Sequence, residues 1–559
     1  MKKQIDLQLF AIFGGGLLFN LLFWNEELGI NLLLHTLFIL LTLCTDRNKL
    51  ADKKVIFFGA ANLFAAICVV YNNAVLNIIG YYFSLLIFIG YAHAHLLKTV
   101  FAAGISGFLQ ILSSPINLVK KIITVKIGKH SLKPFLRPLK YVLIPFIILF
   151  FFTIIYSVAN PVFGSYVDEL GNFIERTFAF IFKDLAFDRI IHIVLGVFFT
   201  AGLLLSFKEN GLEKIEGALT ESLVRKRRQR NNTTFAYEVK SIFFGAAISK
   251  KMALKTENII GIISLFALNL LLLLLNSIDI NTLWLGNAVD VANKNYSAEL
   301  HDGTNALIFS IVMAMMVIIY FFSGNLNFFS RNKFLKTLAY IWIAQNAFLV
   351  CSVLLRDYNY IAMHGLTYKR IGVLVFLSLC TAGLATVYLK VAKQKTLFYL
   401  VKTNGFLWYV ILLSFGIVNW DVLIVNYNID NRKSITLDVD HIMDFSAKTL
   451  PILDKNRAIL AEYASNSHYY DVIDTVTETI DTTSTKASVA EPAIIGKVTA
   501  NIPIDSVKLE AERKLNAVKN FNERLDARIG RYKEGQAQLS WLSWNYRDWK
   551  VEQYFKLNK

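Results

Sequence analysis

The sequence predicts an all-α protein: a polytopic membrane helix bundle of about eleven spans, followed by a C-terminal, mostly helical extracytoplasmic domain. Composition supports this, because 55% of the residues are hydrophobic and only 18% are charged, against about 45–50% and about 25% in soluble domains. Apolar blocks of about 18 or more residues recur, which is the length that crosses a hydrocarbon core of about 30 Å. Basic charge also alternates from loop to loop.

Windows of about 19 residues define the spans. The expected spans are 8–24, 28–45, 55–71, 75–95, 141–159, 189–207, 258–276, 304–323, 335–355, 371–391 and 400–420. We interpret the first as a retained span, because no small-residue cleavage site precedes Asn25. The glycine run in "FGGGLL" (13–18) lies inside this span and indicates close helix packing. The stretch 99–118 is less apolar, and we expect an interfacial or re-entrant segment rather than a twelfth span.

The loops between the spans predict the orientation. Four basic residues lie in 46–54, seven in 119–140 and eleven in 208–256, whereas 160–188 and 277–303 are mainly acidic. Lys and Arg resist translocation, so the basic loops are expected to be cytoplasmic. The N-terminus is then cytoplasmic and the C-terminus extracytoplasmic. One loop that is predicted to be extracytoplasmic, 356–370, departs from this charge pattern. It carries the basic residues Arg356, Lys369 and Arg370 against one acidic residue, Asp357.

Residues 421–559 form the expected outer domain, beyond the membrane domain of residues 1–420. Apolar residues recur at spacings of three and four between 505 and 540, which predicts a long soluble helix, and Pro451 is expected to break an earlier helix in two. Residues 481–493 are rich in Thr, Ser and Ala and are interpreted as a linker. The tryptophan-rich end, 541–554, is expected to dock on its own domain or at the membrane interface, with a peptide or glycan platform as the alternative.

Two polar groups are candidate sites. Glu299, His301 and Asp302 precede the eighth span, where Asp302 is expected to be the N-cap of a helix that starts at Gly303 and Thr304; a proton or metal role for the trio is the alternative. Gln345 and Asn346 lie near the centre of the ninth span. There we expect hydrogen bonds between helices, with a polar substrate site as the alternative.

No motif in the sequence indicates an enzyme. The chain has no GxxxxGK[ST], HExxH or GxSxG pattern and no CxxC pair, so we expect no cofactor and no metal and lean against catalysis. The net charge of +17 is concentrated in residues 1–420. Its position between spans indicates anionic lipid headgroups at the basic cytoplasmic loops rather than nucleic acid.

Several phrases occur together in one order. They are "VANPVFGSYV" (158–167), "YSAELHDGTNALIF" (296–309), "YIAMHGLTYKRIGVL" (360–374), "NWDVLIVNYNI" (419–429), "LDVDHIMDFSAKTLPIL" (437–453) and "WLSWNYRDW" (541–549). From about residue 20 onward the chain resembles the multispanning bacterial membrane proteins of domain of unknown function 4153/4173. The resemblance implies an integral membrane protein and assigns no catalytic residue.

Three functions remain open from the sequence. The first is a membrane scaffold or a signalling and sensing protein, in which the C-terminal domain can bind a protein partner. The second is a transporter or flippase that does not use ATP, and the third is a membrane-embedded, glycosyltransferase-like enzyme. The richness in Lys, Asn, Ile and Phe suggests an AT-rich bacterial genome, and so we expect the bacterial inner (plasma) membrane.

Overall fold

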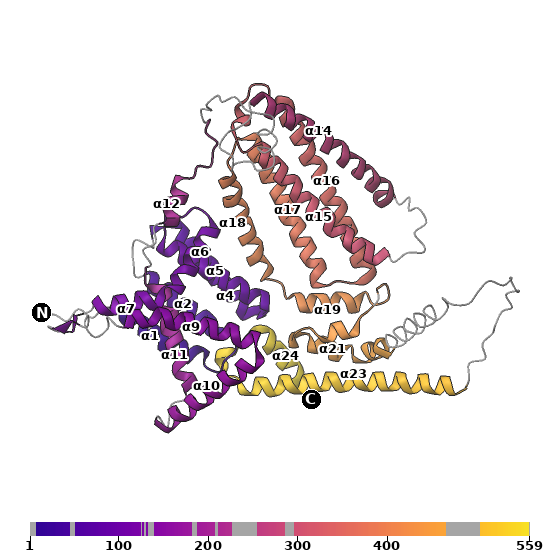
Figure 1. Cartoon of the computed structure of the whole chain (residues 1–559). Helices are drawn as coiled ribbons and strands as arrows, with labels where there is room; N and C mark the ends of the chain where they lie inside the picture. The colour runs from indigo at the N-terminus through magenta and orange to yellow at the C-terminus, as the bar shows by residue number, and fades with distance from the viewer. Residues whose placement is uncertain are drawn as a thin grey trace.

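The computed structural model consists of two helical bundles and a C-terminal helical domain that covers one end of both (Figure 1). It describes residues 7–44, 51–124, 126–127, 130–131, 139–181, 187–206, 211–225, 254–285, 296–435, 437–465 and 504–557. These residues are almost entirely helical. A small antiparallel hairpin of β1 (Lys126–Ile127) and β2 (His130–Ser131) interrupts the basic stretch after α7.

The first bundle is built around five apolar helices. These are α1 (Leu7–Phe23), α2 (Ile30–Cys44), α4 (Lys53–Asn72), α5 (Val75–His93) and α11 (Phe187–Leu204), joined by α6 (Val100–Leu112), α7 (Ser114–Thr124), α9 (Leu139–Ala159) and α10 (Pro161–Ile181). The glycine run of α1 lies against α11, where a Cβ at Gly15 would be 2.5 Å from Thr200 and one at Gly16 2.3 Å from Val197. This confirms the packing role predicted for the run, because only glycine permits such an approach.

The stretch 99–118 forms α6 and the start of α7, which are bent by 56° at their junction. The bend packs on α11 near its C-terminal end, where a Cβ at Gly202 would lie 2.8 Å from the Cα of Ile111 and 3.3 Å from Ser114. The two helices together are long and apolar enough for one broken span, so this shape fits both a re-entrant segment and a further span.

The second bundle contains the remaining apolar helices. They are α14 (Leu254–Asp279) with its π-helical extension η2 (Ile280–Trp284), α15 (Tyr296–Phe321), α16 (Lys333–His364), α17 (Tyr368–Ala392) and α18 (Leu397–Phe415), with the short η3 (Asn325–Phe328) between α15 and α16. Lys390 of α17 is 1% exposed, and its Nζ donates to Phe322 O at 2.6 Å. The ammonium group therefore meets the carbonyl end of α15, where the helix dipole favours a cation.

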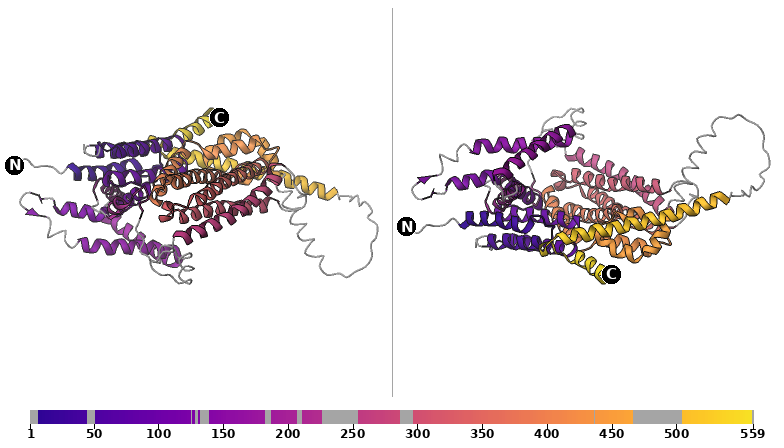
Figure 2. Two further views of the ribbon diagram at one scale, coloured as in Figure 1. Left: turned by 90° about the horizontal axis from the view of Figure 1, so that it is seen from above. Right: turned by 90° about the horizontal axis from the view of Figure 1, so that it is seen from below.

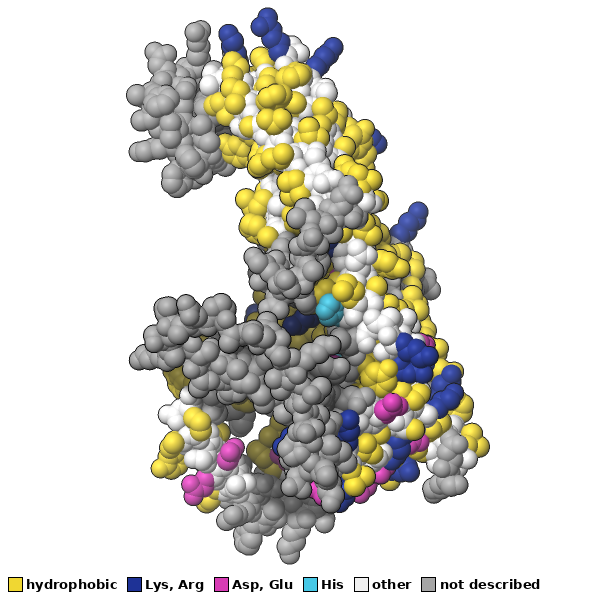
Figure 3. Space-filling view, turned by 90° about the vertical axis from the view of Figure 1, so that its right-hand side faces the viewer, with side chains coloured by type: hydrophobic (Ala, Val, Ile, Leu, Met, Phe, Trp, Pro, Cys, Tyr) yellow, Lys and Arg dark blue, Asp and Glu magenta, His cyan; other side chains and the backbone are white. Residues whose placement is uncertain are grey.

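Each predicted span coincides with an apolar helix. Within the described residues, seven helices are long and apolar enough to cross a membrane, and shorter apolar helices lie at the other predicted positions, namely Gln8–Phe23, Ile30–Leu43, Ile148–Ala159 and Asn305–Phe321. Large apolar side chains are exposed on them, such as Phe266 (58%) and Leu270 (62%). Seen from the side (Figure 3), hydrophobic side chains dominate the face of the second bundle, whereas charges of both signs gather over the C-terminal domain.

Several helix boundaries differ from the prediction, including those of α16 and α15. Helix α16 continues nine residues beyond the expected span end at 355, because no Gly or Pro interrupts it before Gly365, whose φ of 80° ends the helix. Helix α15 begins at Tyr296 rather than at Gly303. Part of each expected outer loop is therefore helical.

The C-terminal domain consists of short helices packed on one long helix. The elements are α19 (Trp420–Asp430), α20 (Val439–Met443), η4 (Ala447–Thr449), α21 (Leu450–Lys455), α23 (Ile504–Gln538), η5 (Trp541–Ser543) and α24 (Tyr546–Leu557). The predicted helix at 505–540 is confirmed by α23, which lies along the second bundle in the view from below (Figure 2). The stretch around Pro451 is divided into short helices, as predicted, and Pro451 lies in the first turn of the later one, α21. The expected linker 481–493 lies outside the described residues.

A strap of residues 211–225, including α12 (Gly211–Ala218), connects the two bundles at the end opposite the C-terminal domain (Figure 1). Glu216 accepts from the backbone N–H of Lys98 at 2.5 Å, just before α6. Further along the strap, Glu221 O accepts from Thr396 N at 3.0 Å, before α18, and Glu221 pairs with Lys402 at 2.5 Å. The hydrogen bond and charge of Lys402 lower the pKa of Glu221.

Candidate functional site

The trio Glu299, His301 and Asp302 lies within the first turns of α15. Because the helix begins at Tyr296, Asp302 is inside it and the N-cap prediction is wrong. The side chains of the three lie outside the described residues, so a joint role for them stays a prediction. Among the side chains that are described, no group of three or more His, Cys, Asp or Glu could hold a metal ion.

Of the two candidate residues in α16, Gln345 makes hydrogen bonds to another helix, whereas Asn346 bonds within its own helix. Gln345 Nε2 donates to Asn269 Oδ1 of α14 at 3.2 Å, and Asn276 Nδ2 donates to Gln345 O at 3.2 Å. Asn346 is 2% exposed and donates to Trp342 O in its own helix at 2.8 Å. This arrangement is a polar contact between α14 and α16, as interhelical hydrogen bonding predicts.

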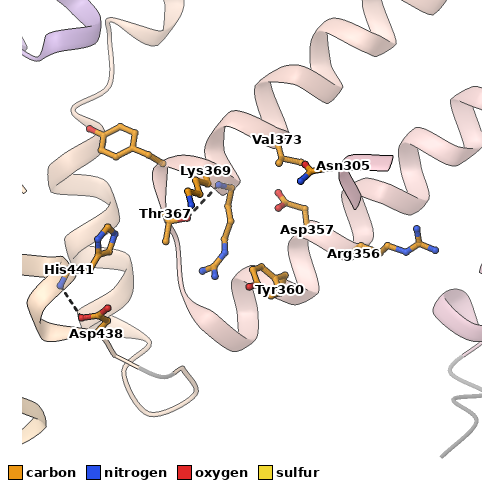
Figure 4. Close-up of a pocket in the computed structure, with 11 residues that line it drawn as sticks. Asn305, Arg356, Asp357, Tyr360, Thr367, Lys369, Val373, Asp438 and His441 are labelled. Carbon is orange, nitrogen blue, oxygen red and sulfur yellow. Dashed lines mark hydrogen bonds between the residues drawn. The ribbon is translucent and has the colours of Figure 1, made fainter. Parts of the chain in front are cut away.

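A cavity of about 520 Å³ lies where the second bundle meets the C-terminal domain, and we call it the junction pocket (Figure 4). Its lining comes from α15, the outer ends of α16 and α17, and α20. The lining residues are Asn305, Arg356, Asp357, Tyr360, Thr367, Tyr368, Lys369, Arg370, Val373, Asp438 and His441. The volume falls within the range of about 300–1,000 Å³ that is typical of small-molecule sites.

The length of α16 positions the pocket. Its 32 residues extend about 48 Å at about 1.5 Å per residue, well beyond a hydrocarbon core of about 30 Å. The turn after it is fixed by Asn428 of α19, whose Oδ1 accepts from Leu366 N at 2.6 Å and whose Nδ2 donates to Leu366 O at 2.9 Å. The C-terminal domain thus binds the backbone of the turn that carries the pocket residues.

The three basic residues of the pocket differ in their interaction partners. Arg356 pairs with the buried carboxylate of Asp279 in α14. Arg370 donates to His364 O at 2.8 Å and to Gly365 O, and its guanidinium lies 4.3 Å from the ring centre of Tyr360. Lys369 is exposed at the pocket mouth.

Asp357 is the buried acid of the pocket. The residue is 6% exposed, and its Oδ2 has no hydrogen-bond partner. In Figure 4 its carboxylate projects into the pocket beside Asn305 and Val373. A buried carboxylate oxygen without a partner destabilises a folded protein. No side chain that lines the pocket donates a hydrogen bond to this oxygen.

A second cavity, of about 450 Å³, lies between α23 and α24. Its lining includes Trp541, Trp544 and Trp549, which are 69%, 40% and 40% exposed. Tyr532 crosses the gap and donates to Asp548 O at 2.9 Å; its burial and the charge of Asp548 raise the pKa of the phenol. The tryptophan-rich end therefore docks on its own domain while keeping exposed indole faces, so neither sequence alternative is removed.

The C-terminal segment also contacts the first bundle. Ile30 N donates to Trp544 O at 3.0 Å, Glu27 N donates to Ser543 Oγ at 2.8 Å, and Ser540 N and Ser543 Oγ both donate to Glu26. Burial raises the pKa of Glu26, but these hydrogen bonds outweigh it and hold the pKa below its usual value of 4.5. Glu26 is thus part of a docking contact between the C-terminal segment and the first bundle.

Comparison with known proteins decides the family. A family model described as "Domain of unknown function (DUF4153)" matches residues 32–456. The chain belongs to the DUF4153 family. This confirms the predicted family, and five of the six phrases lie within the match, whereas "WLSWNYRDW" (541–549) lies beyond it. The match includes every residue that lines the junction pocket, whereas the tryptophan-lined cavity lies beyond it. Searches of curated proteins and of solved structures found no match.

Sequence reasoning did not find the junction pocket, because its lining in this DUF4153 chain comes from three separated stretches, at 305, 356–373 and 438–441. One signal pointed to it. The only basic residues that opposed the predicted orientation of loop 356–370 were Arg356, Lys369 and Arg370, and all three line the pocket. Basic residues that depart from the predicted charge pattern of the loops therefore mark the site.

Proposed function

We propose that the protein is a membrane scaffold with a sensing role, in which the outer domain couples the two bundles and the junction pocket receives a ligand. The observation that carries the proposal is that the C-terminal domain is hydrogen-bonded to end turns of both bundles. Asn428 binds the α16–α17 turn, Ser543 binds the α1–α2 turn, and Lys448 Nζ donates to Asn73 O between α4 and α5 at 2.7 Å.

The proposed membrane arrangement has eleven spans in a bacterial inner membrane, with the N-terminus cytoplasmic and the C-terminus outside. Support comes from the grouping of the contacts. The turns at 25–29, 72–74 and 364–371 meet the C-terminal domain, while the segments at 96–99 and 394–396 meet the strap. We propose that the basic cytoplasmic loops contact anionic lipid headgroups and that the outer domain can bind a protein partner.

Distance measurements in nanodiscs test the coupling. Spin labels on exposed Leu21 of α1 and Tyr358 of α16, in a background without the native cysteines, report on the outer ends of the two bundles. The double variant N428A/S543A removes side-chain hydrogen bonds from one docking contact on each bundle, so the distance distribution should broaden. As a matched control, N522A removes an amide that bonds only to Val518 O of its own helix at 2.9 Å, and it should leave the distribution unchanged.

The same protein, reconstituted into liposomes, tests the transporter or flippase alternative. A scaffold should give no net flux of labelled lipid or small solute across liposomes. Flux that is abolished by Gln345→Ala, together with an unchanged distance distribution in N428A/S543A, would replace the scaffold proposal with the transporter or flippase.

A further inference from the structure

The junction pocket presents opposite charges that do not neutralise each other by direct contact. Asp357 lies inside with an oxygen that lacks a hydrogen-bond partner, whereas Arg370 donates hydrogen bonds to backbone carbonyls and Lys369 is exposed at the mouth. Arg356, by contrast, is paired with Asp279. The groups of the pocket that remain available to a ligand are therefore one buried carboxylate oxygen, of Asp357, and the basic side chains of Lys369 and Arg370.

We infer that the junction pocket binds a zwitterionic phosphoethanolamine-type group, a primary ammonium joined by a short carbon bridge to a phosphate. The ammonium would donate to Asp357 Oδ2 and so remove the cost of a buried, unpartnered acceptor. The phosphate would lie against Lys369 and Arg370, since guanidinium and ammonium groups are the usual protein partners of phosphate.

The position of the pocket fits a headgroup at the membrane surface. Helix α16 carries Asp357 past the hydrocarbon core, and the neighbouring Tyr358 and Met363 are 66% and 59% exposed, which is suited to acyl chains or to the interface. The same chemistry can come from an aminophospholipid or from a soluble phosphoethanolamine ester. This inference deepens the proposed sensing function and rests on it for its biological meaning.

Binding of small probes tests the chemistry. In purified full-length protein, phosphoethanolamine should bind at least tenfold more tightly than glycerol phosphate, which lacks the ammonium group. D357N should abolish this preference, and K369Q should weaken both probes several-fold. The control K393Q changes an exposed lysine outside the pocket and should alter neither. Equal affinity of wild-type protein for the two probes, or an unchanged preference in D357N, would overturn the inference.

Folding of D357N is checked by its thermal unfolding without ligand. If that variant does not fold, K369Q decides instead, because Lys369 is on the surface: a phosphoethanolamine affinity equal to that of wild type would then overturn the inference. The source is identified by comparing nanodiscs that contain or lack phosphatidylethanolamine. A rise in Tm with the lipid identifies the headgroup, and a rise only with the soluble ester identifies that ester. A rise with neither counts against the inference.

The two proposals can fail separately. If phosphoethanolamine binds with the expected selectivity but does not change the distance between Leu21 and Tyr358, the ligand site is supported and the sensing role is rejected. If that distance broadens in N428A/S543A but phosphoethanolamine does not bind, the coupling of the bundles is supported and the ligand site is rejected.

Discussion

A single residue, Gly365, determines how the backbone turns between α16 and α17. Gly365 has a φ of 80°, and a Cβ there would lie 2.6 Å from Asn428 Oδ1. The glycine thus allows two things at once: the end of α16 and the close approach of the amide that binds Leu366. A single position controls both the helix end and the docking contact.

Gly365→Ala should therefore destabilise the protein by about 1–3 kcal/mol, the cost of holding a non-glycine residue in a region that favours glycine. Thermal unfolding in detergent measures the change. Gly372→Ala, in the same region of the chain, is the matched control because nothing lies within 4 Å of its Cβ position, and it should be neutral or slightly stabilising. Equal effects of the two substitutions would contradict the account.

Glu26 makes one docking contact dependent on pH. Its pKa is lower in the folded protein than the usual value of 4.5, so its contribution is fully present above the usual pKa and is lost as the pH falls through the lowered one. Between pH 7 and pH 5 the emission of Trp541 and Trp544 should be constant, and an acid transition should follow below about pH 4.5. The transition should be absent in E26Q and retained in E27Q. Its persistence in E26Q would assign it to other carboxyls.

At the scale of elements, small residues set how closely helices approach. A Cβ at Gly90 of α5 would lie 1.9 Å from Ala103 O, and one at Gly107 of α6 would lie 2.0 Å from Leu86 O. The two helices therefore touch backbone to backbone, which is a common way for helices to gain packing energy in a bilayer.

Gly90→Ala should force α5 and α6 apart and destabilise the first bundle by about 1–3 kcal/mol or more, because overpacking displaces backbone. Gly14→Ala in α1, where nothing lies within 4 Å, should have little effect. Loss of helical circular dichroism on heating measures both. An unchanged Tm in Gly90→Ala would show that the α5–α6 contact is looser than described.

At the scale of the whole molecule, the predicted orientation is testable by reporters. A reporter that is active only outside the cytoplasm should be active when fused after Lys559 and inactive when inserted after Lys393, which lies in the loop that meets the strap. The positive-inside rule is the reason for this expectation. The opposite pattern would invert the arrangement and place the junction pocket in the cytoplasm.

The sequence predicted the apolar segments well because hydropathy over about 19 residues is a strong local signal, and each segment has a matching helix. It predicted the start of α15 and the end of α16 poorly, because hydropathy marks only the apolar part of a helix and both helices extend into polar sequence. The junction pocket depends on contacts between distant segments, such as Asn428 with Leu366, and these have no local signature. Only the misplaced basic residues of 356–370 pointed toward it.

The strap carries a mechanical consequence. Glu216 ties it to the first bundle and Glu221 ties it to the second, while the C-terminal domain bridges the same two bundles at the other end. The two bundles also pack on each other between these ends, where the hydroxyl groups of Ser84 in α5 and Tyr409 in α18 are hydrogen-bonded at 2.7 Å. Because the ties lie on either side of this contact, tilting one bundle against the other must change the spacing at both ends or break one of the ties.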